Sequence, residues 1–340
     1  NMKKLIIACF TVLSANSAQA QETGMKLWYD RPATQWVESL PLGNGRLGAM
    51  VYGDPIHEEF QLNEETIWGG SPYNNTNPKA KEALPQIRQL IFESRNKEAQ
   101  ALCGPNICSQ TANGMPYQTV GSLHLDFEGI SSYSNYYREL DIEKAVTTTR
   151  FTAGGVTYTR EAFTSFPDQL LIIRLTASEK GKLSFTARYS TPYQENITKS
   201  ISSRKELQMD GKANDHEGIE GKVQFTALTR IERNGGHMES VSDTLLRVRN
   251  ANSVTIYVSI GTNFINYKDI SGNARKTAQT YLKNAGKNYL KAKEAHCATY
   301  GKWFNRVSLD LGSNAQAAKP TDVRVHEFAS AFDPQLAALY

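Results

Sequence analysis

The side chains best suited to chemistry lie in one block, residues 40–72. The block combines amide, guanidinium, carboxylate and indole groups within a glycine-rich stretch. A sugar requires hydrogen-bond donors and acceptors for its hydroxyls and a flat apolar surface for the C–H face of its ring, and these residue types provide both. The block therefore indicates a saccharide site, and the candidates for lining a substrate cleft are Asn44, Arg46, Asn63, Glu64 and Trp68.

Glycines and apolar residues predict how this block is built. Glycine permits positive φ and close backbone approach, so the glycines around the apolar run Leu47–Tyr52 predict a turn, a strand and a second turn. A second short strand, Glu59–Leu62, leads to Asn63. A phosphate-binding loop is a poor alternative, because the glycines do not open a helical pattern and no Gly-Lys-Ser/Thr triplet is present.

A structural alternative stays open for the same residues. Glycine and asparagine are ordinary turn residues, so in this interpretation Asn63 and Glu64 cap a turn while Trp68 packs in the core. Adjacent carboxylates such as Glu58 and Glu59 are not a natural catalytic pair, since neighbours on a strand point to opposite faces. We therefore do not expect a free-standing active site in this block.

Composition and charge narrow the class of protein. The chain has 340 residues, of which 40% are hydrophobic and 21% are charged, and its net charge is +4. These values describe a globular protein without a membrane span, of about two domains by its length. No run of lysine or arginine indicates a nucleic-acid partner.

The histidines predict no metal site. The six histidines show no paired ligand spacing, so neither a metal nor another cofactor is expected. His124 and Asp126 alternate with leucines and fall on one face of a predicted strand. They form either a solvated strand face or a pair that faces a ligand.

The N-terminus has the pattern of an export signal. Two lysines precede the apolar stretch Leu5–Leu13, and Ala18–Ala20 has the form of an A-x-A cleavage site. We predict a signal peptide over residues 1–20, cleaved after Ala20, and a secreted protein of the periplasm or the extracellular space. Cys103 and Cys108 either form a disulfide, which an oxidising compartment permits, or remain as two free thiols.

Most of the middle of the chain predicts β-strands. Short segments rich in β-branched and aromatic residues, separated by Gly, Asn, Asp or Pro, indicate a large antiparallel sandwich. One helical insertion is expected at Pro85–Phe92, with Pro85 in its first turn. The predicted strands are residues 145–151, 156–163, 170–175, 183–189, 223–228, 245–248 and 254–260.

Beyond about residue 273 the periodicity becomes helical. Apolar residues recur at steps of three and four from Ala278 to Trp303, with a break expected near Gly286. A strand-like piece at Arg306–Leu311 and a polar linker follow. Two further helical patterns then cover residues 325–332 and 336–340. Because the last one ends on apolar residues without a cap, we expect the sequence to be a fragment that continues beyond Tyr340.

Several segments together resemble glycoside hydrolase family 95. They cover almost the whole mature chain in family order, and they are residues 40–72, 114–127, 262–269, 304–312 and 333–340. The family consists of exo-acting α-L-fucosidases, and some members act on α-L-galactosides. The resemblance implies a mainly β fold, an antiparallel β-supersandwich followed by linker helices and the first helix of a truncated (α/α)6 barrel. The implied boundaries are residues 24–272 for the sandwich, 273–320 for the helical linker and 321–340 for the start of the barrel.

The resemblance also implies where the reaction takes place. In the family, a barrel glutamate is the general acid, and asparagines polarised by an aspartate hold the attacking water, which gives inversion. All of these positions follow Tyr340, so no catalytic residue is assigned to this chain. The implied substrate is a fucosylated oligosaccharide or glycan, and the implied partner of the sandwich is its own C-terminal helical barrel. Two alternatives stay open, an α-L-galactosidase of the same family and a non-catalytic carbohydrate-binding β-sandwich module.

Overall fold

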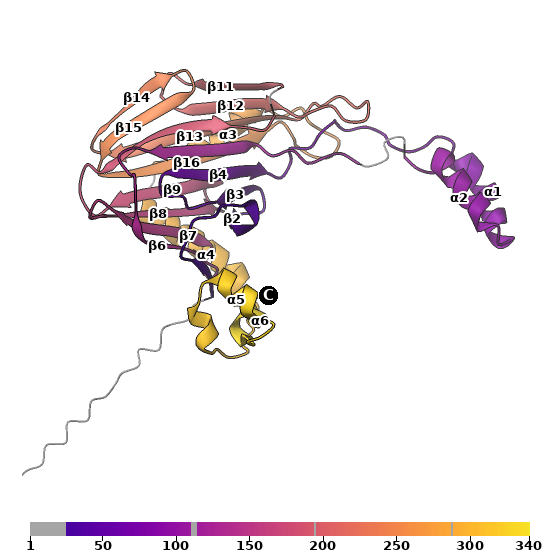
Figure 1. Cartoon of the computed structure of the whole chain (residues 1–340). Coiled ribbons are helices and arrows are strands. Elements are labelled where there is room, and N and C mark those ends of the chain that lie inside the picture. Colours follow the sequence, from indigo (N-terminus) through magenta and orange to yellow (C-terminus); the bar gives the residue numbers. More distant parts are fainter. Residues whose placement is uncertain (1–24, 110–113, 194, 287) are drawn as a thin grey trace, which may run out of the picture.

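The structure, a computed structural model, describes residues 25–109, 114–193, 195–286 and 288–340. The predicted signal peptide, residues 1–20, lies outside these residues. Two large antiparallel sheets dominate the described part of the chain and lie face to face (Figure 1). The predicted mainly β fold with helices towards its C-terminal end is confirmed. Across the described ranges, no helix is long and apolar enough to cross a membrane.

The first sheet has nine strands among the described residues, in the order β1-β6-β7-β8-β9-β16-β13-β12-β11. Each strand pairs with its neighbour in antiparallel register. The strands are β1 (Lys26–Tyr29), β6 (Ser134–Asp141), β7 (Val146–Ala153), β8 (Val156–Ser165), β9 (Leu170–Ala177), β11 (Ile197–Ile201), β12 (Leu207–Lys212), β13 (Gln224–Asn234) and β16 (Ser253–Thr262).

The second sheet has seven strands within the same described ranges, in the order β14-β15-β10-β5-β4-β3-β2. Short 3-10 helices cover Trp36–Glu38 and Ala315–Ala318. The strands of this sheet are β2 (Leu40–Gly43), β3 (Leu47–Val51), β4 (His57–Glu64), β5 (Gly121–Phe127), β10 (Leu183–Ser190), β14 (His237–Ser242) and β15 (Leu245–Ala251).

The main core lies between the two sheets, because the strands alternate apolar and polar side chains. In β5, Leu123, Leu125 and Phe127 are buried, while His124 and Asp126 lie half-buried on the outer face. Successive side chains on a strand point to opposite faces, so one face of each sheet fills the sandwich. The predicted common face of His124 and Asp126 is confirmed.

A smaller core joins the outer face of the nine-stranded sheet to two helices, α3 (Ala274–Leu282) and α4 (Tyr289–Phe304). Ala278 and Leu282 of α3 pack against this sheet, as does Ala292 of α4. The predicted helical break is confirmed, because α3 ends at Leu282 and Gly286 has a φ of +83°, a conformation that glycine adopts easily.

Gly261 of β16 permits a close approach of α3 to the sheet. A Cβ at this position would lie 2.5 Å from the backbone nitrogen of Ala278 and 2.6 Å from the carbonyl oxygen of Ala274. We expect Gly261→Ala to lower the free energy of unfolding by about 1–3 kcal/mol, the usual effect of overpacking. Urea unfolding measures it, with Gly43→Ala as the control, since a Cβ there meets nothing closer than 3.7 Å. Equal stability of the two variants would contradict the packing argument.

The helical insertion is larger than predicted. It consists of α1 (Ala80–Phe92) and α2 (Asn96–Asn106). Pro85 therefore lies inside α1 and not in its first turn, because the helix begins five residues earlier than expected. The second helix carries no clear apolar periodicity and contains Gly104 and Pro105, which argue against a helix in sequence analysis.

The C-terminal segment differs from the prediction in two places. Residues 306–311 are not a strand, because no neighbouring strand pairs with them among the described residues. The last two helices are α5 (Thr321–Glu327) and α6 (Pro334–Leu339), so α5 begins earlier than predicted. Asp333 caps α6 by accepting a hydrogen bond from the backbone N–H of Leu336 at 2.9 Å, ahead of a proline in the first turn.

Candidate functional site

The turn between β2 and β3 is fixed by Asn44. Its carboxamide oxygen accepts hydrogen bonds from the backbone N–H groups of Arg46 at 3.1 Å and Leu47 at 2.8 Å. Its Nδ2 donates to the carbonyl oxygen of Ser165, at the end of β8, at 3.0 Å. Asn44 is only 5% exposed. Its amide is therefore used to join this turn to the other sheet.

Arg46 extends the same connection. Its Nε donates to Gln169 Oε1 at 2.8 Å, its Nη2 to the carbonyl oxygen of Gln169 at 3.2 Å, and its Nη1 to the carbonyl oxygen of Ile260 in β16 at 2.7 Å. Nη1 also lies 3.5 Å from Glu64 Oε1. The guanidinium carbon sits 4.4 Å from the centre of the Tyr281 ring of α3, a cation–π contact. One side chain thus connects both sheets with the covering helix.

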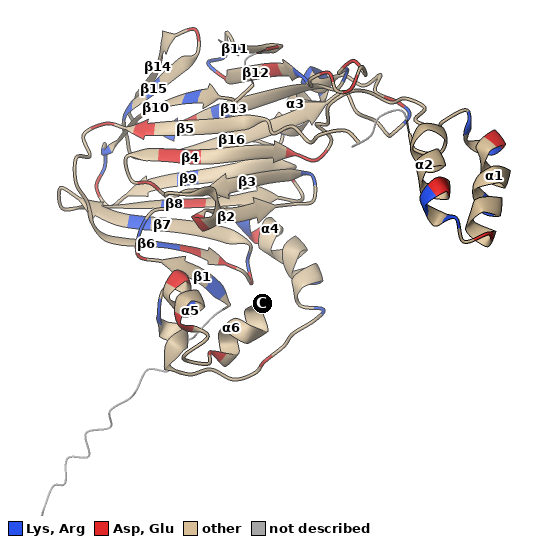
Figure 2. Cartoon of the chain, turned by 45° about the vertical axis from the view of Figure 1, so that its right-hand side comes forward, with Lys and Arg blue, Asp and Glu red and all other residues tan. Residues whose placement is uncertain are grey.

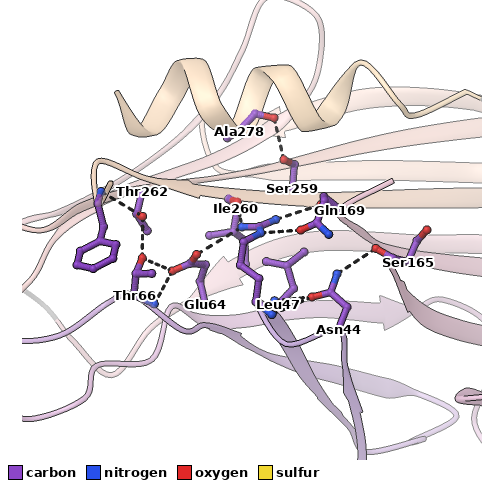
Figure 3. Close-up of polar contacts among 12 residues, drawn as sticks. Asn44, Leu47, Glu64, Thr66, Ser165, Gln169, Ser259, Ile260, Thr262 and Ala278 are labelled. Atoms are coloured by element: carbon purple, nitrogen blue, oxygen red, sulfur yellow. Dashed lines mark hydrogen bonds and ion pairs between the residues drawn. The ribbon is translucent and has the colours of Figure 1, made fainter. Parts of the chain in front are cut away.

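Glu64, at the end of β4, continues the network on the far side of Arg46. Its Oε2 accepts hydrogen bonds from the backbone N–H of Thr66 at 2.8 Å and from the Thr66 hydroxyl at 2.6 Å. The Thr66 hydroxyl in turn lies 2.7 Å from the Thr262 hydroxyl at the end of β16. Figure 3 shows these contacts as a continuous chain of polar groups between the two sheets.

Asn44, Arg46 and Glu64 therefore form one internal network, which we call the intersheet network. Their polar groups bond to the protein, and Glu64 is only 2% exposed. Buried charged groups are stable only when they are paired and hydrogen-bonded, which these are. Their contacts support a role in bracing the two sheets.

Trp68 and Asn63 lie outside the intersheet network. Trp68 is 46% exposed, and its Nε1 donates to the carbonyl oxygen of Glu65 at 2.8 Å. Its ring meets Tyr117 edge-on, with 5.4 Å between the ring centres, and the two backbones form a β-bridge. Asn63 is half-buried and pairs with Gly48 across β3 and β4. Trp68 is thus held in a fixed orientation with part of its ring open to solvent.

Tyr117 belongs with Trp68 and was not among the predicted site residues. Its hydroxyl donates to the carbonyl oxygen of Glu64 at 3.4 Å, and burial together with the nearby Glu64 charge raises its pKa to about 12. At neutral pH the phenol is therefore uncharged and remains a donor. The sequence indicates Tyr117 only indirectly, because this residue lies within residues 114–127, one of the segments that resemble glycoside hydrolase family 95.

A second buried ion pair lies between the sheets, formed by Glu58 of β4 and Arg160 of β8. Glu58 Oε2 is 2.8 Å from Arg160 Nη1, and Glu58 Oε1 accepts from the backbone N–H of Gly53 at 2.7 Å. Burial raises the pKa of Glu58, and the Arg160 charge opposes that shift. Glu59 points to the other face and accepts from the Ser122 hydroxyl at 2.7 Å. The expectation that adjacent carboxylates diverge is confirmed.

The outer face of the seven-stranded sheet has its own polar contacts. His124 Nε2 lies 2.6 Å from the Ser190 hydroxyl, and Asp126 Oδ1 lies 2.9 Å from His57 Nδ1. His124 and Asp126 thus contact different partners and do not converge on a common point. Within the described residues, no group of three or more His, Cys, Asp or Glu side chains is placed to hold a metal ion.

The two cysteines of the helical insertion are free thiols. Cys103 lies in α2, and Cys108 follows its end. The backbone N–H of Cys108 donates to the carbonyl oxygen of Cys103 at 3.0 Å, so the helical turn continues past the last assigned residue. Both are free thiols in this structure, and the disulfide that an oxidising compartment permits stays a prediction.

Comparison with known families divides the chain into two parts. Residues 27–267 match the family described as "Glycosyl hydrolase family 65, N-terminal domain". Residues 288–340 match the "Glycosyl hydrolase family 95 catalytic domain", so this match begins at the start of α4. The first match covers the two sheets.

Curated relatives match along nearly the full chain. "Alpha-L-fucosidase 2" from Arabidopsis thaliana is 31% identical over 93% of this chain and 40% of its own length. "Probable alpha-fucosidase A" from Aspergillus niger is 28% identical over 91% of this chain and 40% of its own length. The chain therefore spans about two fifths of the length of these relatives.

The solved structure of a protein from the human microbiome, described as a kojibiose phosphorylase, has a fold similar to that of this chain. The TM-score is 0.50 at 12% identity, covering 87% of this chain and 40% of that one. Together with the match over residues 27–267, this places the two sheets in a known architecture. The chain belongs to the glycoside hydrolases as a family 65-type N-terminal domain joined to the first part of a family 95 catalytic domain, the arrangement of a fucosidase-like N-terminal portion.

Proposed function

We propose that the protein carrying this chain is a secreted, exo-acting α-L-fucosidase of family 95 that releases terminal α-linked L-fucose with inversion. The main support is that similarity to an α-L-fucosidase runs over 93% of the chain and continues into a family 95 catalytic domain from residue 288. The export pattern before Gln21 supports secretion. We propose residues 24–272 as the sandwich, 273–320 as the linker and 321–340 as the first part of the barrel.

The chemistry of inversion supports placing the reaction outside the sandwich. An inverting glycosidase needs an acid and a water-activating group about 6.5–9.5 Å apart on opposite sides of the sugar. Within residues 40–72, Glu58 forms an ion pair with Arg160, and Glu64 is hydrogen-bonded within the intersheet network. We therefore place the catalytic groups in the part of the catalytic domain that follows Tyr340, with the sandwich as its support.

The full-length protein should release L-fucose from 2′-fucosyllactose, and this chain alone should not. Proton NMR of the first product should show β-L-fucose, because inversion converts the α-linkage to the β-anomer. Release by this chain alone would overturn the placement of the catalytic groups, and α-L-fucose as the first product would overturn inversion. Faster hydrolysis of an α-L-galactoside would favour the galactosidase alternative. Binding without hydrolysis by the full-length protein would favour a carbohydrate-binding module.

Among the candidate residues of segment 40–72, Trp68 has an aromatic ring that is exposed to solvent. Replacing Trp68 therefore tests whether the sandwich contacts the substrate. We expect Trp68→Ala in the full-length protein to raise KM roughly three- to tenfold, the range of an aromatic contact, with little change in melting temperature. Trp68→Phe keeps a flat ring and should restore most of the affinity. A lower melting temperature with unaltered KM would show instead that Trp68 only braces the segment around Tyr117.

A further inference from the structure

Helices α1 and α2 form a helical hairpin that projects away from the sandwich. The chain leaves the seven-stranded sheet after β4 and returns to it at β5, and the helices lie at the far end of this excursion (Figure 1). Two hydrogen bonds close the base of the hairpin, from Asn77 Nδ2 to the carbonyl oxygens of Pro105 at 3.1 Å and Cys108 at 3.0 Å. Figure 2 shows the same separation from the sheets in a second view.

The hairpin has very little core of its own. Its buried apolar side chains are Ile87, Leu90 and Ala99, packed against the half-buried Ala83 and Leu102. The helices have 13 and 11 residues. Helices shorter than about 12–15 residues are marginal in water, and units below about 40 residues usually need an additional staple or partner. A surface to pack against would therefore stabilise the hairpin.

A second apolar stripe on α1 is left uncovered. Phe92 is 85% exposed, Ile91 51% and Leu84 38%. Spacings of seven and eight residues place these side chains on one side of the helix, next to the side that buries Ile87 and Leu90. A separate groove of about 510 Å³ between the two helices has a mainly polar and charged lining and includes none of these three side chains. Charges of both signs are mixed along the hairpin in Figure 2, so the apolar stripe is the feature that a partner would recognise.

Exposed apolar residues continue from the hairpin towards the sandwich. Trp68 lies in the segment between β4 and α1, and Tyr117 lies in the segment between α2 and β5. Ile265 and Tyr267 follow β16. The segment that follows β4 and the end of β16 are neighbours, because the hydroxyls of Thr66 and Thr262 are in contact. Exposed apolar side chains thus lie on two neighbouring segments at this end of the sandwich.

We propose that the helical hairpin docks, through Leu84, Ile91 and Phe92, onto the part of the family 95 catalytic domain that follows Tyr340 in the same polypeptide. The chain spans 40% of the length of its curated relatives, so a large folded partner is available in cis. The proposal rests on the proposed function only in requiring that this domain is present. The hairpin then holds the sandwich and the catalytic domain in a fixed relation.

Amide hydrogen exchange tests the docking directly. Exchange over residues 80–106 is compared between this chain and the full-length protein. We expect exchange in the full-length protein to be at least about tenfold slower, because covering Phe92 and Ile91 stabilises the hairpin against local opening. Equal exchange in the two proteins would overturn the proposal.

A paired substitution identifies the contact residues. Ile91→Ala with Phe92→Ala should not speed the exchange of this chain, since both side chains are exposed in it and alanine favours a helix, and should remove the protection seen in the full-length protein. Val241→Ser, at an exposed position on the edge strand β14, is the control and should alter neither. Unchanged protection in the full-length double variant would overturn the assigned contact.

Two further measurements separate other outcomes. Sedimentation velocity of this chain should show a monomer, and a dimer that the double substitution dissociates would show that a second copy covers the hairpin. Release of L-fucose from 2′-fucosyllactose is measured on the same full-length samples. Activity without hairpin protection would overturn the docking alone, and protection without activity would overturn the proposed function alone.

Discussion

Replacing Arg160 with methionine is expected to lower the free energy of unfolding of this chain by about 3–5 kcal/mol, because it leaves a buried carboxylate without its partner. Arg160 and Glu58 are almost completely buried and 2.8 Å apart. The guanidinium also donates to the carbonyl oxygens of Asp54 and Pro55, and its central carbon lies 4.0 Å from the centre of the Phe127 ring. Methionine fills a similar volume but supplies no donor and no charge.

The loss of stability in the Arg160→Met variant should depend on pH. Burial raises the pKa of Glu58 above its ordinary value of 4.5, so the folded state holds this proton more tightly than the unfolded state. Stability therefore falls as pH rises from that ordinary value through the folded pKa. Without the opposing charge of Arg160 the folded pKa rises further, which extends the fall to higher pH. We expect the Arg160→Met variant to lose less stability at about pH 5 than at about pH 7.5.

Urea unfolding followed by circular dichroism at both pH values measures this difference. Arg160→Lys serves as the matched variant, because it keeps the positive charge but not the fork of donors, and it should recover part of the stability. An equal loss for Arg160→Met at the two pH values would show that Glu58 is not the group responsible.

Replacing Arg46 with alanine should have an effect of similar size, about 3 kcal/mol or more, because it removes the donors that join the two sheets and leaves Glu64 buried without its cation. Thermal or urea unfolding of this chain measures the change. Arg188→Ala is the control, since the Arg188 side chain is 43% exposed, its ion pair with Asp126 spans 3.4 Å, and such surface pairs contribute about 1 kcal/mol or less. Unchanged stability with weakened substrate binding in the full-length protein would contradict the bracing role.

The sequence predicts most of the central strands but misses several strands at or next to the sheet edges, including β6 and β12. β9 and β16 are buried on both faces, and both are rich in apolar and β-branched residues, which is a strong signal. No residue of the edge strand β11 is buried, and the edge strand β14 is mostly exposed, so burial imposes no pattern on either strand. The segment at residues 306–311 shows the opposite error, because its alternating residues have no neighbouring strand among those described.

The sequence identifies residues 40–72 as a segment of interest, but it does not predict which way the side chains of this segment point. Arg46 bonds to Gln169 and Ile260, which lie far from it in sequence and reach it only when the sheets pack together. No local pattern identifies these partners. Trp68 is a different case, since its exposure depends on how residues 67–70 are tied to residues 116–118 by backbone hydrogen bonds such as Gly69 N–H to Pro116 O at 2.8 Å.

The point at which the helical hairpin leaves the sheet has a consequence for how this protein can change over evolution. Leu62 of β4 pairs directly with Gly121 of β5, so the two ends of the insertion are adjacent strand positions. The entropy of closing a loop grows only logarithmically with its length, so shortening or lengthening this excursion has little effect on strand pairing. The hairpin can therefore be lengthened, shortened or exchanged without disturbing the pairing of β4 with β5.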